Sequence, residues 1–137
     1  MTDQIVASLS GLIPFLAYFG GGTVLLLLFS FVYLRVTPYP EIELVRQGKT
    51  APAISFGGAL IGFVCPLYSA ISHSVNLVDM IIWALVALVV QIVVFVVLRI
   101  MFSRLIDDIA EDRIGPAVFL AFVSVAAGLI NAASMTY

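Results

Sequence analysis

Four long runs of apolar residues organise the chain. They lie at about residues 12–36, 51–72, 77–101 and 116–136. Each run can cross the hydrocarbon core of a membrane, because a transmembrane helix needs roughly 20 apolar residues. A membrane β-barrel would need alternating apolar and polar positions, and the leucine run 25–28 has no such alternation. The pattern therefore predicts an all-α integral membrane protein with four transmembrane helices.

Polar positions gather in the short segments between these runs. Residues 37–50 and 102–115 mix charged and apolar residues, which predicts a short interfacial helix in each segment. Gly48 can end the first of these helices in the left-handed conformation. Residues 72–76 predict a tight polar turn, after which Asp79 is expected to cap the third transmembrane helix.

The two halves of the chain resemble each other at a shift of about 64 residues. The matching positions include charged residues and prolines in the same order: Arg35 with Arg99, Glu43 with Asp107, Lys49 with Arg113, and Pro52 with Pro116. Chance similarity between apolar segments would match leucines and valines instead. We therefore expect two tandem two-helix repeats, residues 1–72 and 73–137. Each copy contains an even number of spans, so the copies should share one orientation, as parallel repeats do.

Composition narrows the class of protein further. The 137 residues are 63% hydrophobic and only 10% charged, with a net charge of -2, whereas about a quarter of a soluble domain is charged. The chain is therefore not an ordinary soluble domain, and without a basic patch we expect no nucleic-acid partner. One cysteine, Cys65, and one histidine, His73, cannot make a disulfide framework or a zinc site within one chain. We expect no cofactor.

All basic residues lie in or beside the two long connecting segments. They are Arg35, Arg46, Lys49, Arg99, Arg104 and Arg113. Because basic residues stay on the cytoplasmic side of a membrane, both long loops should be cytoplasmic. The same rule places both termini and the turn at His73 on the periplasmic side.

Two of the predicted helices have a face made of small residues. The face on the second span recurs at intervals of three and four and includes Ser55, Gly58, Gly62, Cys65 and Ser69; the face on the fourth span includes Ser124, Gly128 and Asn131. Small faces let helix backbones approach closely in lipid, so helix packing is the first interpretation. The second interpretation is a narrow pathway lined by these faces, with Gln91 of the third span and Tyr68 nearby.

The spans lack the residue sets that catalysis needs. No Asp, Glu, Lys or Arg lies in the core of a span, although ionisable groups at membrane depth usually mark proton relays and ion-coupled transport. No carboxylate pair, nucleophile with a base, or set of metal ligands lies at that depth. We therefore expect that the protein is not an enzyme.

Several segments of the sequence resemble one known family. They are Tyr33–Pro38, Ser55–Gly62 with Pro66 following, and the ending Asn131–Tyr137. Together with four spans in two repeats, these segments are similar to the YjfL-type inner-membrane proteins of bacteria, and the resemblance covers nearly the whole chain. It implies a multi-pass location in the bacterial inner membrane and two tandem copies of a two-span domain. The family is uncharacterised, so the resemblance supplies no catalytic residue.

These patterns favour a structural or interaction protein. We expect a small inner-membrane subunit, surrounded by the lipid bilayer, that forms a homo-oligomer. Its two long loops are the surface available to a cytoplasmic protein partner. The alternative is a small channel or transporter for a neutral or weakly selected solute. The two functions differ in whether a continuous polar pathway crosses the bundle.

Overall fold

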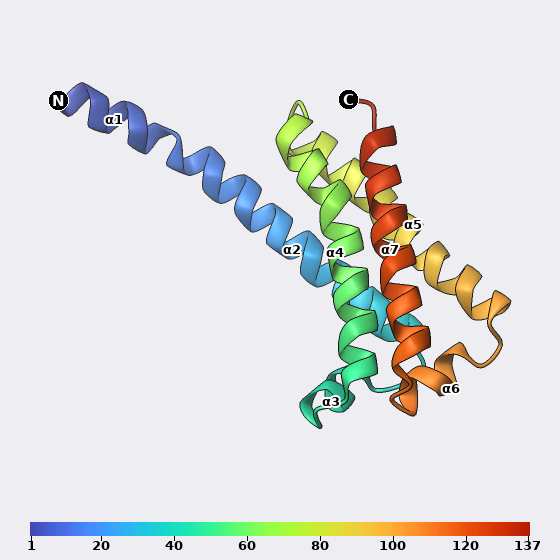
Figure 1. Ribbon diagram of the computed structural model, residues 1–137. Coiled ribbons are helices and arrows are strands. Elements are labelled where there is room, and N and C mark those ends of the chain that lie inside the picture. Colours follow the sequence, from blue (N-terminus) through green and yellow to red (C-terminus); the bar gives the residue numbers. More distant parts are fainter.

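Seven α-helices and no strand make up the chain in the computed structural model, which describes residues 1–137 (Figure 1). The helices are α1 Thr2–Ser10, α2 Leu12–Val36, α3 Glu41–Arg46, α4 Thr50–His73, α5 Leu77–Met101, α6 Leu105–Ala110 and α7 Ile114–Ser134. Four helical stretches are long and apolar enough to cross a membrane. The first consists of α1 and α2 together, and the other three are α4, α5 and α7. The prediction of an all-α membrane protein with four spans is therefore confirmed.

The helix bounds agree closely with three of the four predicted spans. The helices α2 and α5 match their predictions, and α4 is one residue longer at each end. The fourth span differs, because α7 begins at Ile114 instead of Pro116 and ends at Ser134 instead of Thr136. Pro116 takes the third position of α7, where an N–H has no partner within the helix, so the helix can begin ahead of the proline.

The helix α1 was not predicted from the sequence. This helix continues almost directly into α2, with Gly11 between them in the right-handed helical region (φ -75°, ψ -14°). Together they form a rod of 35 residues, Thr2–Val36. The rod diverges from the other helices, so its N-terminal part lies away from the bundle (Figure 1). No residue of α1 is buried.

The helices α4 and α7 form the centre of the bundle. They run in the same direction and make the most extensive helix–helix contact in the molecule (Figure 1). The helix α5 packs against both of them, whereas α2 packs on α4 and α5. The buried residues of α2 lie on one stripe with helical spacing, namely Gly22, Leu25, Phe29 and Tyr33. Aromatic packing fixes this stripe, since the rings of Phe29 and Phe63 stack with their centroids 4.5 Å apart.

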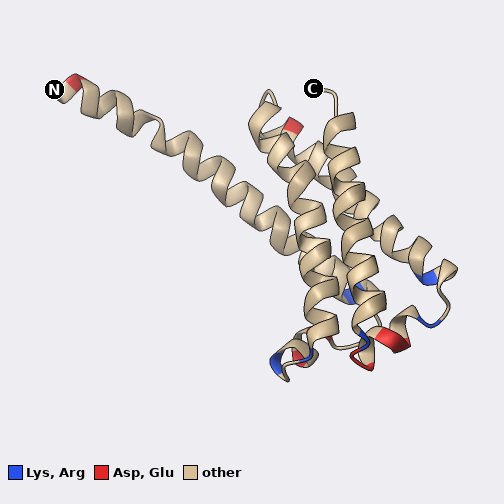
Figure 2. Ribbon diagram, viewed as in Figure 1, with Lys and Arg blue, Asp and Glu red and all other residues tan.

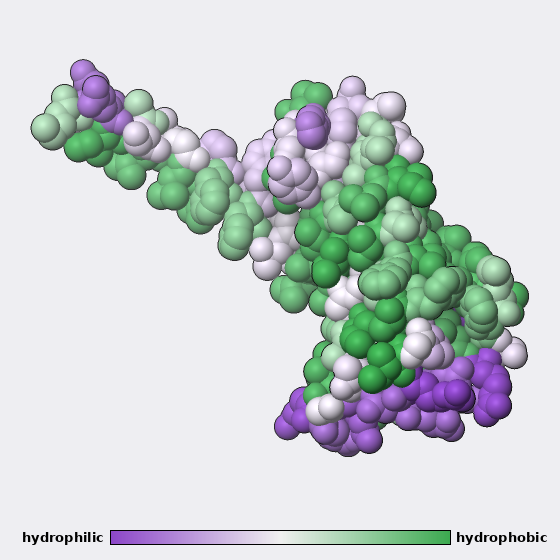
Figure 3. Space-filling view, viewed as in Figure 1, coloured by the Kyte–Doolittle hydropathy of each residue, from purple (hydrophilic) through white to green (hydrophobic).

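Charged residues concentrate at one end of the bundle (Figure 2). Arg35 and Arg99 lie in the last turns of α2 and α5, where a cation complements the helix dipole. The other four basic residues lie in or beside the short helices α3 and α6. This end forms a hydrophilic band below the apolar body of the molecule (Figure 3). This band, together with the two short helices α3 and α6, is called the charged end below.

Two left-handed residues end the short helices at the charged end. Gly48 follows α3 with φ 84°, as the sequence predicted. Asp112 follows α6 with φ 63°, the one non-glycine residue with positive φ. Its carboxylate accepts a hydrogen bond of 2.8 Å from the backbone N–H of Ala51, in the first turn of α4. This bond links the two long loops and satisfies an N–H that the helix itself cannot satisfy.

The cap of α5 differs from the prediction. Asn76, not Asp79, is the N-cap residue, and its side chain accepts a 2.9 Å hydrogen bond from the N–H of Asp79. The Asp79 carboxylate accepts a 3.1 Å bond from the N–H of Val75. Asp79 sits three positions after the cap, as in a capping box, but its carboxylate reaches the N–H of the residue before the cap.

Candidate functional site

The small faces of α4 and α7 meet each other directly. A Cβ atom added to Gly58 would overlap Ala121, and one added to Gly62 would overlap the backbone of Ser124. A Cβ on Gly128 would overlap the backbone of Gly62 in turn. The two backbones therefore approach as closely as only glycine allows, which is the geometry of small-residue helix pairs in lipid.

Two serines and a glutamine complete this contact. Ser55 and Ser124 are buried, and the Ser55 hydroxyl donates to the carbonyl of Pro52 at 3.1 Å, within its own helix. Gln91 projects from α5 into the contact and is only 1% exposed. Its Nε2 donates a 3.0 Å hydrogen bond to the carbonyl of Ser124, while its Oε1 has no partner. The Gln91 side chain therefore joins α5 to α7 at mid-span.

The remaining predicted residues lie at the edge of the contact. Cys65 is a half-buried free thiol, and Ser69 shares a 2.8 Å hydrogen bond with the hydroxyl of Tyr137. Asn131 is half-buried and its Nδ2 has no partner. Tyr68 was expected to lie near the contact between α4 and α7. This expectation is wrong, because Tyr68 is 70% exposed and belongs to the outer surface of α4.

An unpredicted polar cluster lies at the charged end. Glu41, the first residue of α3, is only 1% exposed, and neither of its carboxylate oxygens has a hydrogen-bond partner. The hydroxyls of Tyr33 and Tyr39 adjoin it and are likewise buried without partners. Ser55 of α4 lies beside Tyr39. Glu41 lies in the polar segment 37–50, where no sequence pattern indicated burial, although the matching position in the second half is the apolar Leu105.

Burial dominates the electrostatics of this cluster. It raises the pKa of Glu41 from 4.5 to about 8, and the nearby Tyr39 hydroxyl acts in the opposite direction. Burial and the adjacent Glu41 carboxylate both raise the pKa of Tyr39 above its ordinary value. Glu41 is therefore a carboxyl group whose charged form the surrounding structure disfavours.

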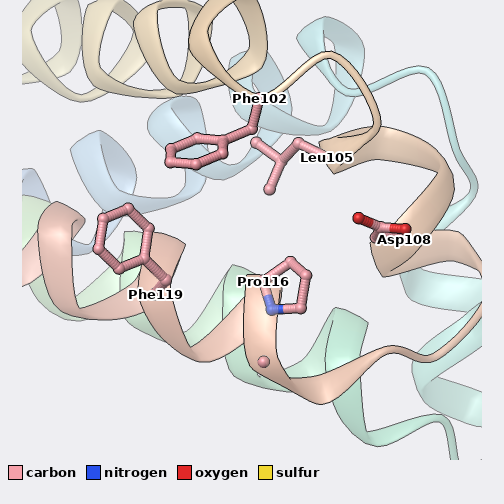
Figure 4. A pocket seen from close by; sticks show the side chains of 6 residues that line it. Phe102, Leu105, Asp108, Pro116 and Phe119 are labelled. Carbon is pink, nitrogen blue, oxygen red and sulfur yellow. The ribbon is translucent and has the colours of Figure 1, made fainter.

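An apolar cavity of about 370 Å³ lies between α6 and the first turn of α7. Phe102, Leu105, Pro116 and Phe119 surround it, together with Gly115 (Figure 4). Asp108 at its edge faces Arg113 at 3.4 Å. The cavity holds one carboxylate that is already paired with a cation, and no group of three His, Cys, Asp or Glu that could hold a metal ion occurs in the chain.

Comparison with known proteins places this architecture in a family. Residues 7–135 match the family described as Domain of Unknown Function (DUF350). The chain is 35% identical over 129 residues to the UPF0719 inner membrane protein YjfL of Escherichia coli (strain K12), covering 94% of this chain and 98% of that protein. It is 28% identical over 113 residues to the UPF0719 transmembrane protein YshE of Bacillus subtilis (strain 168), covering 82% and 84%. No solved structure matches the chain.

The family match extends over both halves of the chain and all four spans. It confirms the resemblance to YjfL-type proteins that the sequence indicated. The relatives are named as inner-membrane and transmembrane proteins, without an activity. This chain with four candidate spans therefore belongs to the DUF350 family, whose biochemical function is unknown.

Proposed function

We propose that this protein is a self-associating structural or interaction subunit of the bacterial inner membrane, without enzymatic activity. The observation that carries the proposal is the direct contact between the small faces of α4 and α7. The neighbouring helix fills the space that a side chain would take at Gly58, Gly62 and Gly128. These glycines therefore provide close packing and leave no room between the two backbones. A rigid helix pair of this kind is what a scaffold needs.

Self-association is supported by the shape of the first helix. The rod of α1 and α2 leaves the bundle, and only four residues of α2 are buried. The rest of the rod offers apolar surface to lipid or to another copy. Among soluble oligomers, closed homo-oligomers are the commonest, and by the same reasoning a second copy is the partner that we propose for this surface.

The proposed orientation places the charged end in the cytoplasm and both termini in the periplasm. Its support is the position of all six basic residues at one end of the bundle (Figure 2). That end is also the surface that we propose for a cytoplasmic protein partner, because it carries a continuous hydrophilic band (Figure 3).

The proposed tandem repeat is supported by the arrangement of the short helices. The helices α3 and α6 each contain six residues, and each is followed by a left-handed residue, Gly48 or Asp112. Each long helix that comes next has proline at its third position. We propose that residues 1–72 and 73–137 are copies of one two-helix unit in the same orientation.

Two measurements test the proposed function. Native mass spectrometry from mild detergent and from lipid nanodiscs should show a homo-oligomer, whereas a monomer under every lipid condition would contradict self-association. Purified protein in liposomes should cause no leak of water, small neutral solutes or monovalent ions beyond that of empty liposomes. A reproducible flux that depends on the protein would favour the channel or transporter instead.

A further inference from the structure

The buried carboxyl group at the charged end has no cation beside it. Glu41 begins α3, which packs against α4; its two oxygens make no well-formed hydrogen bond, and the Tyr39 hydroxyl is the polar group that adjoins them. A buried polar group without a partner costs free energy, and a buried charge costs more. A side chain that only fills space would therefore be apolar at this position.

The second half of the chain shows such an apolar side chain. The helix α6 has the same length as α3, and its first residue, Leu105, is 3% exposed. Leu105 therefore occupies for α6 the buried position that Glu41 occupies for α3. The positions that match Tyr33 and Tyr39 at the same shift are Val97 and Ser103, without phenols. The first half thus buries three oxygen-bearing side chains, and the matching positions of the second half bury no such side chain.

No base neutralises Glu41. The guanidinium of Arg35 lies over the ring of Phe31, 4.9 Å from its centroid, and Arg46 pairs with Glu43 at 3.7 Å. The titratable groups that face Glu41 are Tyr33 from α2 and Tyr39 from the linker. The helix α4 contributes Ser55, which does not titrate.

Water can reach the neighbourhood of this carboxyl group. A cavity of about 340 Å³ lies beside α3 and is lined by Leu34, Tyr39, Ile42 and Glu43 as well as Glu41. The Glu43 side chain is 56% exposed, so this cavity borders bulk solvent. Solvent therefore lies close to the buried carboxyl group.

We propose that Glu41, with the phenol groups of Tyr33 and Tyr39, forms a proton-binding site at the charged end, and that loss of the proton releases α3 from the bundle. A protonated carboxyl is neutral and can donate its O–H to a neighbouring phenol oxygen. An ionised carboxyl has no cation to pair with here, so it gains hydration only by leaving the buried position.

The direction of the pH effect follows from the shifted pKa. Burial raises the pKa of Glu41 from 4.5 in the exposed chain to about 8 in the folded protein. Between these values the folded protein holds a proton that the unfolded chain has lost, so stability falls as pH rises through this range. The stabilisation is complete below the lower value and lost above the higher one.

Infrared spectroscopy tests the proton directly. The carbonyl stretching band of a protonated carboxylic acid should be present in the purified protein at neutral pH and disappear with a midpoint near pH 8. The band should be absent from Glu41→Gln and unchanged in Glu43→Gln, which removes an exposed carboxylate two residues away. A band with the same midpoint in Glu41→Gln would overturn the assignment.

Hydrogen exchange tests the release of α3. Above about pH 8, the amides of α3 should exchange faster in the natural protein than in Glu41→Gln at the same pH, a comparison that cancels the intrinsic pH dependence of exchange. Glu41→Leu copies the residue found at Leu105 and should keep α3 protected at every pH. Equal protection in all three proteins above that pH would show that the proton does not hold α3.

A metal cation is the competing ligand for the same oxygens. Thermal melts with Na⁺, K⁺ or Ca²⁺ at about pH 9, where the carboxyl is ionised, should show no stabilisation specific to Glu41. Stabilisation by one of these ions that Glu41→Gln abolishes would identify a metal site and overturn the proton site.

Discussion

Two glycines on α4 differ in what surrounds them. Gly62 lies where the backbones of α4 and α7 touch, and an added Cβ would collide with the Ser124 carbonyl and approach the Gln91 side chain. Gly57 lies on the same helix with nothing within 4 Å of an added Cβ. The same residue type is therefore required at one position and replaceable at the other, which makes the pair a test of the contact.

The substitution Gly62→Leu should separate α4 from α7. We expect a loss of stability of about 1–3 kcal/mol, since overpacking a tight contact forces backbones apart. Gly57→Leu should leave stability unchanged or slightly higher, because leucine has the better helix propensity. Thermal melts in detergent compare the two variants with the parent, and equal melting of both variants would contradict the packing role of Gly62.

At the scale of the elements, a loop from the other half of the chain supplies a hydrogen-bond acceptor to the first turn of α4. The Asp112 carboxylate holds the N–H of Ala51 at the start of α4, where a negative charge also complements the helix dipole. The corresponding helix α7 has no side-chain cap at its start. The position that matches Asp112 in the first half is Gly48, which has no side chain to offer.

Removing the Asp112 carboxylate should destabilise the bundle. Asp112→Gly keeps a residue that tolerates the positive φ of 63°, so its effect of about 1–2 kcal/mol combines the lost hydrogen bond with the greater freedom of glycine in the unfolded chain. Asp112→Ala should cost more, because alanine also resists the left-handed conformation. Asp107→Ala removes an exposed carboxylate without a side-chain hydrogen bond and should be silent in the same melts. If Asp112→Gly melts like the parent, the bond to Ala51 has no stabilising role.

The elements differ in how far the sequence predicts them. The four spans follow from uninterrupted apolar runs, and the small faces follow from their three- and four-residue spacing. The burial of Glu41 and the bond from Asp112 to Ala51 depend on how loops fold over the bundle, which periodicity within one segment does not encode. The helix α1 escaped notice because Asp3, Gln4, Ser8 and Ser10 interrupt its apolar residues. Spacing also could not tell which side of α4 Tyr68 occupies.

At the scale of the whole molecule, nearly all the charge lies at one end of the bundle. The six basic residues and the short helices lie at this charged end, while the termini and the polar turn before α5 lie at the other (Figures 1 and 2). Four spans return the chain to the side from which it starts. The side of the membrane on which one terminus lies therefore defines the position of the other.

Fusions at the C-terminus test this topology. An alkaline phosphatase fused after Tyr137 should be active, since that enzyme works in the periplasm, and a fluorescent protein that matures only in the cytoplasm should stay dark there. The expectation rests on the retention of basic residues on the cytoplasmic side. The same reporters placed after Lys49 should give the opposite result. An inactive phosphatase with a bright fluorescent fusion at Tyr137 would reverse the orientation.

The rod of α1 and α2 is longer than a bilayer is thick. At about 1.5 Å per residue, its 35 residues measure about 52 Å, whereas a helix with an average tilt of about 20° crosses the hydrocarbon layer of about 30 Å in about 32 Å. The excess of about 20 Å is longer than the nine residues of α1, which measure about 14 Å. Ile5, Val6 and Leu9 share one face of α1, so that face can rest on acyl chains while Asp3 meets the headgroups. The thickness of the bilayer therefore determines how much of α1 lies within the hydrocarbon layer.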